Sequence, residues 1–138
     1  MTGPPQVLFV CVHNAGRSQI AEALFNAYAG GRAVGASAGT EPVGGLNLNV
    51  IAAMREAGFD IASQHPKQLT EEMIDASERV VTMGCAADDP ACPAAVVDED
   101  WGIDDPAGAP LPRVREIRDE IARRVRKLLR EMGIEPVR

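Results

Sequence analysis

The chain has 138 residues, enough for one domain over residues 1–138, and a formal net charge of −6. Nucleic acids and anionic membranes are bound mainly by excess Lys and Arg, so this charge argues against both partners. The opening MTGPPQ has no basic segment, and the apolar run after it is too short for a signal peptide or a membrane span. We therefore expect a cytoplasmic protein that binds any anion locally.

The first recognisable elements enclose the segment CVHNAGRS at residues 11–18. Residues 7–10 are apolar and predict a buried strand, whereas residues 19–24 begin a helix. The unpaired N–H groups at a helix start can bind a tetrahedral oxyanion, and Gly16 permits close backbone approach. Cys11 lies in the same positive field, which favours a nucleophilic thiolate, and Arg17 can hold two oxyanion oxygens.

The remaining elements alternate along the chain between helix and strand. Expected helices occupy residues 20–29, 49–57, 70–76 and 111–132, and expected strands residues 34–37, 79–83 and 95–97. This alternation predicts an α/β fold with a parallel sheet and helices on both faces. Ligands of such sheets bind beyond the carboxyl ends of the strands.

The three cysteines, Cys11, Cys85 and Cys92, do not form a structural framework in a reducing compartment. They indicate nucleophilic, redox or metal chemistry. A zinc site at Cys85 and Cys92 lacks a second pair of ligands, because the two His residues, His13 and His65, lie far away in the sequence. We therefore expect no structural metal.

Asp105 can reach the same edge of the sheet through the loop DEDWGIDDPAG. A carboxyl group beside the nucleophile can protonate a departing oxygen. The other interpretation of the Asp-Pro pair is a simple turn. Two further alternatives stay open: GASAGT either packs behind the first loop, with Ser37 hydrogen-bonded into it, or is only a turn; His13 either lines the pocket or is inert.

Four segments together resemble one family: CVHNAGRS after a strand, ASAG, VVTMGC followed by a further Cys, and WGIDDPAG. They are similar to the arsenate reductases that share the low-molecular-weight tyrosine phosphatase fold and are recycled by thioredoxin or a related redoxin. The resemblance covers roughly residues 6–130. It implies a three-layer sandwich with a central parallel four-stranded sheet, and a role in arsenic detoxification.

The resemblance also implies roles for individual residues. Cys11 attacks the oxyanion, Arg17 binds it and Asp105 is the general acid, whereas Cys85 and Cys92 resolve the adduct through successive disulfides. The residues implied to bind the oxyanion or support the loop are His13, Asn14, Ala15, Gly16, Arg17, Ser18 and Ser37. No cofactor is expected to be bound, because a redoxin supplies the electrons.

Two departures from the family pattern concern a cation and the second cysteine. Some members bind potassium through counterparts of Asn14, Glu22 and Ser37 together with an Asp, and that last position aligns here near Lys67 or Gln68. The resemblance therefore implies either no bound metal or a weak potassium site. One additional residue, around Gly84, also precedes Cys85.

Two rival functions remain at this point. A phosphotyrosine phosphatase uses the same loop and acid, but such enzymes place aromatic residues after the Asp-Pro, where this chain has Ala107 and Gly108. A non-enzymatic thiol sensor for redox state or arsenic needs reactive cysteines without turnover. Arsenite production from arsenate with a redoxin separates all three.

Overall fold

The structure is a computed structural model that describes residues 3–84 and 97–138. Its elements alternate between strand and helix with one additional helix before β3. They are β1 (Gln6–Cys11), α1 (Arg17–Ala29), β2 (Val34–Gly39), α2 (Leu48–Glu56), α3 (Glu71–Asp75), β3 (Arg79–Thr82), β4 (Glu99–Asp100) and α4 (Leu111–Glu131).

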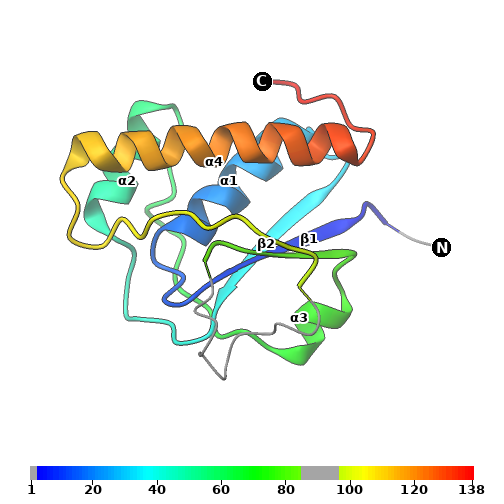
Figure 1. The fold of residues 1–138 in the computed structure, drawn as a ribbon, viewed down its shortest axis with the longest axis horizontal. Helices are drawn as coiled ribbons and strands as arrows, with labels where there is room; N and C mark the ends of the chain where they lie inside the picture. Colours follow the sequence, from blue (N-terminus) through cyan, green and yellow to red (C-terminus); the bar gives the residue numbers. More distant parts are fainter. Residues whose placement is uncertain (1–2, 85–96) are drawn as a thin grey trace.

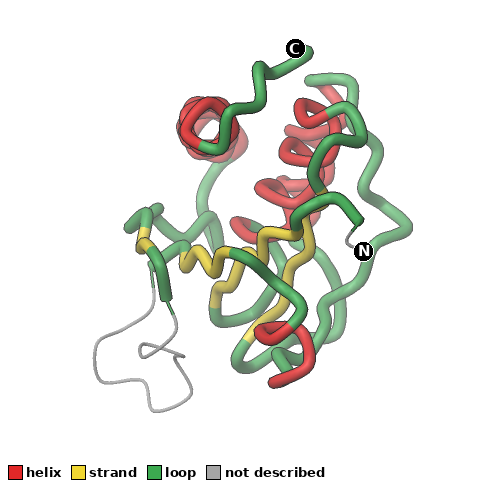
Figure 2. Tube along the Cα trace, turned by 90° about the vertical axis from the view of Figure 1, so that its right-hand side faces the viewer, coloured by secondary structure: helices red, strands yellow, loops and turns green. Residues whose placement is uncertain are grey.

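The four strands form one parallel sheet in the order β2-β1-β3-β4, which confirms the expected α/β fold. Helices α1, α2 and α4 cover one face, and the short α3 lies on the other (Figures 1 and 2). The central strand β1 therefore ends in the middle of the carboxyl edge. Whatever follows Cys11 has the ends of β2 and β3 on either side of it.

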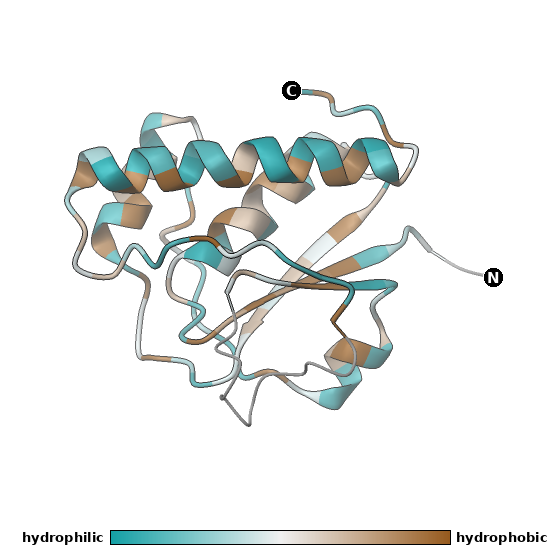
Figure 3. Cartoon of the chain, in the orientation of Figure 1, coloured by the Kyte–Doolittle hydropathy of each residue, from teal (hydrophilic) through white to brown (hydrophobic). Residues whose placement is uncertain are grey.

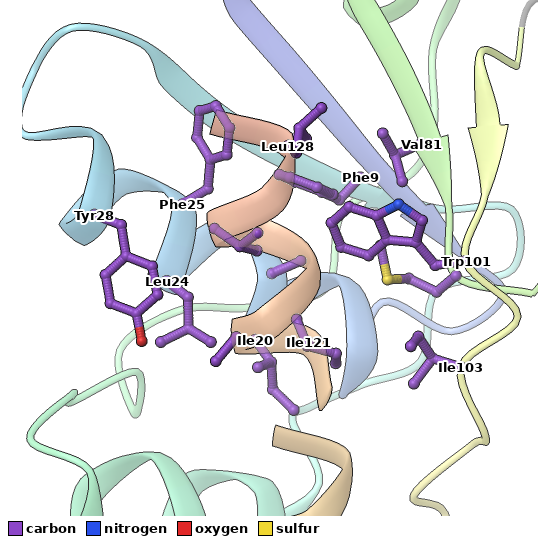
Figure 4. Packing of buried hydrophobic residues seen from close by; sticks show 14 of the residues in the cluster. Phe9, Ile20, Leu24, Phe25, Tyr28, Val81, Trp101, Ile103, Ile121 and Leu128 are labelled. Atoms are coloured by element: carbon purple, nitrogen blue, oxygen red, sulfur yellow. The ribbon is translucent and has the colours of Figure 1, made fainter. Parts of the chain in front are cut away.

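Alternation along β1 explains why both faces are covered. Val7, Phe9 and Cys11 belong to the larger core beneath α1, α2 and α4, whereas Leu8 and Val10 belong to the smaller core beside α3. All five are buried, as is typical of a central parallel strand. Figure 4 shows the larger core, in which Phe9 packs between the rings of Phe25 and Trp101.

The long helix α4 closes the larger core with one apolar face (Figure 3). Its buried side chains recur every three or four residues, as the sequence predicts: Val114, Ile117, Ile121, Val125 and Leu128. Several basic residues of α4 pair with acids, for example Arg115 with Glu56 of α2 and Arg124 with Glu120. The hydrogen bond from Arg115 lowers the pKa of Glu56, and that from Arg124 lowers the pKa of Glu120.

Two elements next to the site have boundaries that differ from those predicted from the sequence. Helix α1 begins at Arg17 rather than residue 19, so Arg17 and Ser18 lie in its first turn. Strand β2 continues to Gly39 instead of ending at Ser37, because it pairs with β1 as far as Cys11. The loop is therefore shorter, and its base more regular, than the sequence indicated.

The fourth strand of the sheet lies later in the chain than the strand that the sequence predicts. It was expected at residues 95–97, of which 95 and 96 lie outside the described residues, but β4 is Glu99–Asp100, paired with Val81 and Thr82. A two-residue edge strand needs no apolar side chains, so hydrophobicity gave no signal for it. Within the described ranges 3–84 and 97–138, no helix is both long and apolar enough to cross a membrane.

Candidate active site

The loop between β1 and α1 forms the centre of the site. Gly16 is the N-cap of α1 and has no side chain to occupy the N–H groups of the first helical turn. These groups have no partners within a helix, and the helix dipole makes that end positive. The geometry thus provides a cradle for an oxyanion directly beyond the end of the central strand.

Cys11 lies at the base of this cradle and is only 3% exposed. The N–H of Asn14 donates to Cys11 Sγ at 3.2 Å, and Ser18 Oγ lies 2.8 Å from the same sulfur. Asn14 Nδ2 donates to Ser18 Oγ at 2.6 Å, which leaves the hydroxyl hydrogen of Ser18 free for the sulfur. The thiol is therefore held by groups that donate to it.

Asn14 has a left-handed backbone with φ 52°, unusual for any residue except glycine. Its fully buried side chain compensates for this conformation with several hydrogen bonds. Asn14 Oδ1 accepts from Gln19 Nε2 at 3.0 Å and from the N–H of Lys67 at 2.9 Å. The adjoining helix α1, through Gln19, and a segment distant in sequence, through Lys67, therefore fix the turn that brings the Asn14 N–H to the sulfur.

Gly39, at the end of β2, passes directly behind the loop. A Cβ atom here would lie 2.6 Å from the carbonyl oxygen of Val12 and 3.0 Å from the backbone nitrogen of Asn14. The expectation that GASAGT packs closely behind the loop holds at this residue. Because the contacts are with backbone, no side-chain rotation can relieve them.

We expect Gly39→Ala to destabilise the fold by about 2 kcal/mol, which lowers the midpoint of thermal unfolding by roughly 6 °C. The matched control is Gly45→Ala, because a Cβ there has no atom within 4 Å. Thermal unfolding followed by circular dichroism measures both. Equal midpoints for the two variants would show that the close approach imposes no constraint.

Arg17 is held by the segments that follow β3 and β4. Its Nη1 donates to the carbonyl oxygen of Ile103 at 2.9 Å and to that of Met83 at 3.4 Å. The guanidinium has five N–H donors, so others remain for an oxyanion. Gly84, with φ 135°, follows directly, and a Cβ on it would lie 3.1 Å from Arg17 Nη1. The chain therefore passes beside Arg17 one residue before Cys85.

Asp105 faces the loop across a small pocket. Its Oδ2 lies 3.9 Å from Arg17 Nη2, and its Oδ1 accepts from the N–H of Ala107 at 2.9 Å. Pro106 packs so closely on Gly16 that a Cβ on Gly16 would lie 2.9 Å from Pro106 Cγ. The pocket has a volume of about 40 Å³ and is lined by Cys11, His13, Ala15, Gly16, Arg17, Asn47, Asp105, Pro106 and Ala107.

Most of the expected site residues thus lie together, but Ser37 does not contact the loop as expected. Its hydroxyl donates to Glu22 Oε1 at 2.7 Å, because its side chain points toward α1 rather than toward Cys11. His13 is exposed and lines the pocket. Cys85 and Cys92 lie outside the described residues.

Sequence reasoning missed three residues that support the site. Gln19 is fully buried and donates to Asn14 and to the carbonyl oxygen of His65. Asn47 caps α2 and lines the pocket, and Lys67 holds Asn14 through its backbone. The sequence could have indicated Gln19, because a polar Gln lies beside the apolar positions of α1. It contains no pattern that indicates a hydrogen bond from the backbone N–H of residue 67.

The chain is similar to known proteins over most of its length. A family model described as low molecular weight phosphotyrosine protein phosphatase matches residues 6–137. An arsenate reductase of Brevibacillus brevis is 36% identical over 129 residues, which cover 92% of this chain and 96% of that protein.

Solved structures show the same fold. A thioredoxin-dependent arsenate reductase of Corynebacterium glutamicum matches with a TM-score of 0.77 and 40% identity. The match covers 96% of this chain but 63% of that one, less than two thirds of its length. An arginine phosphatase of Geobacillus stearothermophilus matches with a TM-score of 0.79 and 25% identity, over 94% of each chain. The fold is thus shared by reductases and phosphatases.

Proposed function

The chain belongs to the low molecular weight phosphotyrosine protein phosphatase family, and on that basis we propose that it reduces arsenate to arsenite. The observation that carries the proposal is the thiol of Cys11 at the base of an oxyanion cradle, with Arg17 and Asp105 at the same pocket. The two further cysteines of the sequence supply the electrons that a phosphatase does not need.

The proposed reaction begins with arsenate in the cradle, held by first-turn N–H groups and Arg17. The Cys11 thiolate attacks arsenic, and Asp105 protonates the oxygen that leaves as water. Cys85 then attacks Cys11 Sγ: the sulfur–arsenic bond breaks, its electron pair stays on arsenic, and arsenite departs. This leaves a disulfide between Cys11 and Cys85.

Cys92 is proposed to open that disulfide by thiol–disulfide exchange, which frees Cys11 and leaves Cys85 joined to Cys92. Thioredoxin or a related redoxin then reduces this last bond. Gly84, the described residue directly before Cys85, lies beside Arg17, and this position supports the relay. Free thiols need a reducing compartment, so the proposal places the reaction in the cytoplasm.

Asp105→Asn is expected to lower the rate of the first chemical step by about 10²-fold while oxyanion binding stays nearly unchanged. The amide keeps an acceptor for the N–H of Ala107 but has no acidic proton to give. Asp104→Asn is the control, because the Asp104 carboxylate pairs with Arg113 instead of the pocket residues. Single-turnover rates decide: less than a threefold loss in Asp105→Asn removes this carboxyl from the mechanism.

A phosphatase is the second candidate, favoured by the structural match to an arginine phosphatase. The described lining of the pocket argues against it, because His13 is the one aromatic ring among the lining residues; the others are Cys11, Ala15, Gly16, Arg17, Asn47, Asp105, Pro106 and Ala107. An aryl phosphate or a phosphoarginine needs contacts for its organic part as well.

The test compares substrates with one protein preparation. Arsenite formation is followed with thioredoxin, its reductase and NADPH, and phosphate release with p-nitrophenyl phosphate and phosphoarginine. We expect arsenate-dependent NADPH oxidation and only slow phosphate release. Rapid phosphate release without arsenite would favour the phosphatase, and reactive thiols with neither turnover would favour the sensor.

A further inference from the structure

Behind the oxyanion loop lies a carboxylate that is largely withdrawn from solvent. Glu22 of α1 has a side chain only 15% exposed. Its Oε1 accepts from Ser37 Oγ at 2.7 Å and its Oε2 from Gln64 Nε2 at 2.9 Å. Both partners are neutral, so they leave the negative charge uncompensated. A carboxylate in such a place is stabilised by a positive charge nearby.

The ammonium group of Lys67 supplies that charge. Lys67 Nζ lies 3.7 Å from Glu22 Oε1, 3.5 Å from Ser37 Oγ and 3.5 Å from the carbonyl oxygen of His65. These distances exceed those of strong hydrogen bonds, so the ammonium acts mainly as a charge surrounded by three oxygens. Among the described residues, it is the one cationic group within 4.0 Å of Glu22.

Hydrogen bonds of the Lys67 backbone connect this residue to Cys11 by way of Asn14. The N–H of Lys67 donates to Asn14 Oδ1 at 2.9 Å, and its carbonyl oxygen accepts from the N–H of Gly39 at 2.8 Å. Asn14 in turn contacts Ser18 and Cys11 Sγ. A displacement of Lys67 therefore acts on the conformation of the loop that carries the thiol.

A free monovalent cation does not fit this arrangement. The oxygens expected to bind potassium were those of Asn14, Glu22 and Ser37. Asn14 Oδ1 already accepts two N–H groups, and the oxygens of Glu22 and Ser37 face the Lys67 ammonium. A second cation placed among them would be repelled by the first.

We propose that Lys67 is a positioning residue whose ammonium is the built-in cation of the oxyanion loop, so that the loop works without potassium. The inference rests on the proposed function only in taking Cys11 to Ser18 as an oxyanion site. Lys67 positions the loop from behind and touches neither the oxyanion nor Cys11.

The chain offers a matched set of variants, because Lys67 and Lys127 are its two lysines. Lys67→Met removes the charge and keeps the backbone N–H, and Lys67→Arg keeps both. Lys127→Met is the control, since this exposed side chain contacts Glu131 on the outer face of α4. Sulfate affinity is measured by calorimetry, in potassium chloride and in tetramethylammonium chloride at equal ionic strength. This readout needs no arsenate reduction, so it stays valid if the proposed activity fails.

Wild type and Lys127→Met are expected to bind sulfate equally in the two salts. Lys67→Met should bind about tenfold more weakly in tetramethylammonium, recover part of the loss in potassium, and be restored by the Lys67→Arg change. Tighter sulfate binding by the wild type in potassium would overturn the proposal, as would a Lys67→Met protein that behaves like Lys127→Met. If Lys67→Met does not fold, the sulfate affinities of the wild type and of Lys67→Arg in the two salts still test the proposal.

Discussion

Cys11→Ser is expected to abolish arsenite production while the protein still binds sulfate. The hydroxyl of serine is a far weaker nucleophile than a thiolate and cannot form the disulfide that carries the electrons away from Cys11. Oxyanion binding should persist, because the first-turn N–H groups of α1 and the guanidinium of Arg17 are unchanged. The smaller oxygen can still reach Ser18, so little stability should be lost.

Two measurements on Cys11→Ser separate chemistry from binding. Arsenite formation should fall to background, and sulfate should raise the midpoint of thermal unfolding as it does in the wild type. Arg17→Lys is the complementary variant: it keeps the thiol but replaces the bidentate guanidinium with a point charge, so the stabilisation by sulfate should weaken. Undiminished turnover in Cys11→Ser would remove Cys11 from the mechanism.

The second large effect is expected for Cys92→Ser. This variant should complete one turnover and then become inactive. Arsenite release needs only Cys11 and Cys85, whereas recycling needs Cys92 to free Cys11. The protein should therefore accumulate a disulfide between Cys11 and Cys85. If Cys92→Ser cycles with the redoxin as fast as the wild type, Cys92 is not the final resolving thiol.

The spacing of the two resolving cysteines makes a conformational demand. Disulfide-bonded Cα atoms lie within roughly 4.4–6.8 Å of each other. Seven positions apart, they would be about 10 Å apart along a helix and over about 20 Å apart in a strand. The bond between Cys85 and Cys92 therefore requires a tight loop over residues 86–91 when it forms. Asp89 and Pro90 favour such a turn.

The sequence was sufficient to predict the features that depend on local pattern. The apolar strand before Cys11, the Gly30 end of α1, the Thr70 cap of α3 and the periodicity of α4 each depend on neighbouring residues, and all are present in the structure. The placing of Cys11, Arg17 and Asp105 at one edge followed from the parallel sheet.

The supports of the site were not predictable in the same way. Lys67 holds Asn14 through a backbone N–H, and any residue except proline offers that group. Ser37 was expected at the loop, yet its position in β2 directs it to Glu22. Strand β4 is too short and too acidic to show a hydrophobic pattern. These features depend on contacts between distant segments, which spacing along the chain does not encode.

We propose that electrons pass from the cysteines of this chain to arsenate bound at Cys11, and a single turnover without any redoxin shows directly whether they do. Fully reduced wild-type protein is mixed with arsenate, the released arsenite is counted per protein, and the disulfides are mapped by peptide mass spectrometry after alkylation. We expect one arsenite per protein, an alkylated Cys11 and a disulfide between Cys85 and Cys92. No arsenite, or arsenite released while all three cysteines remain alkylatable, would contradict the proposal.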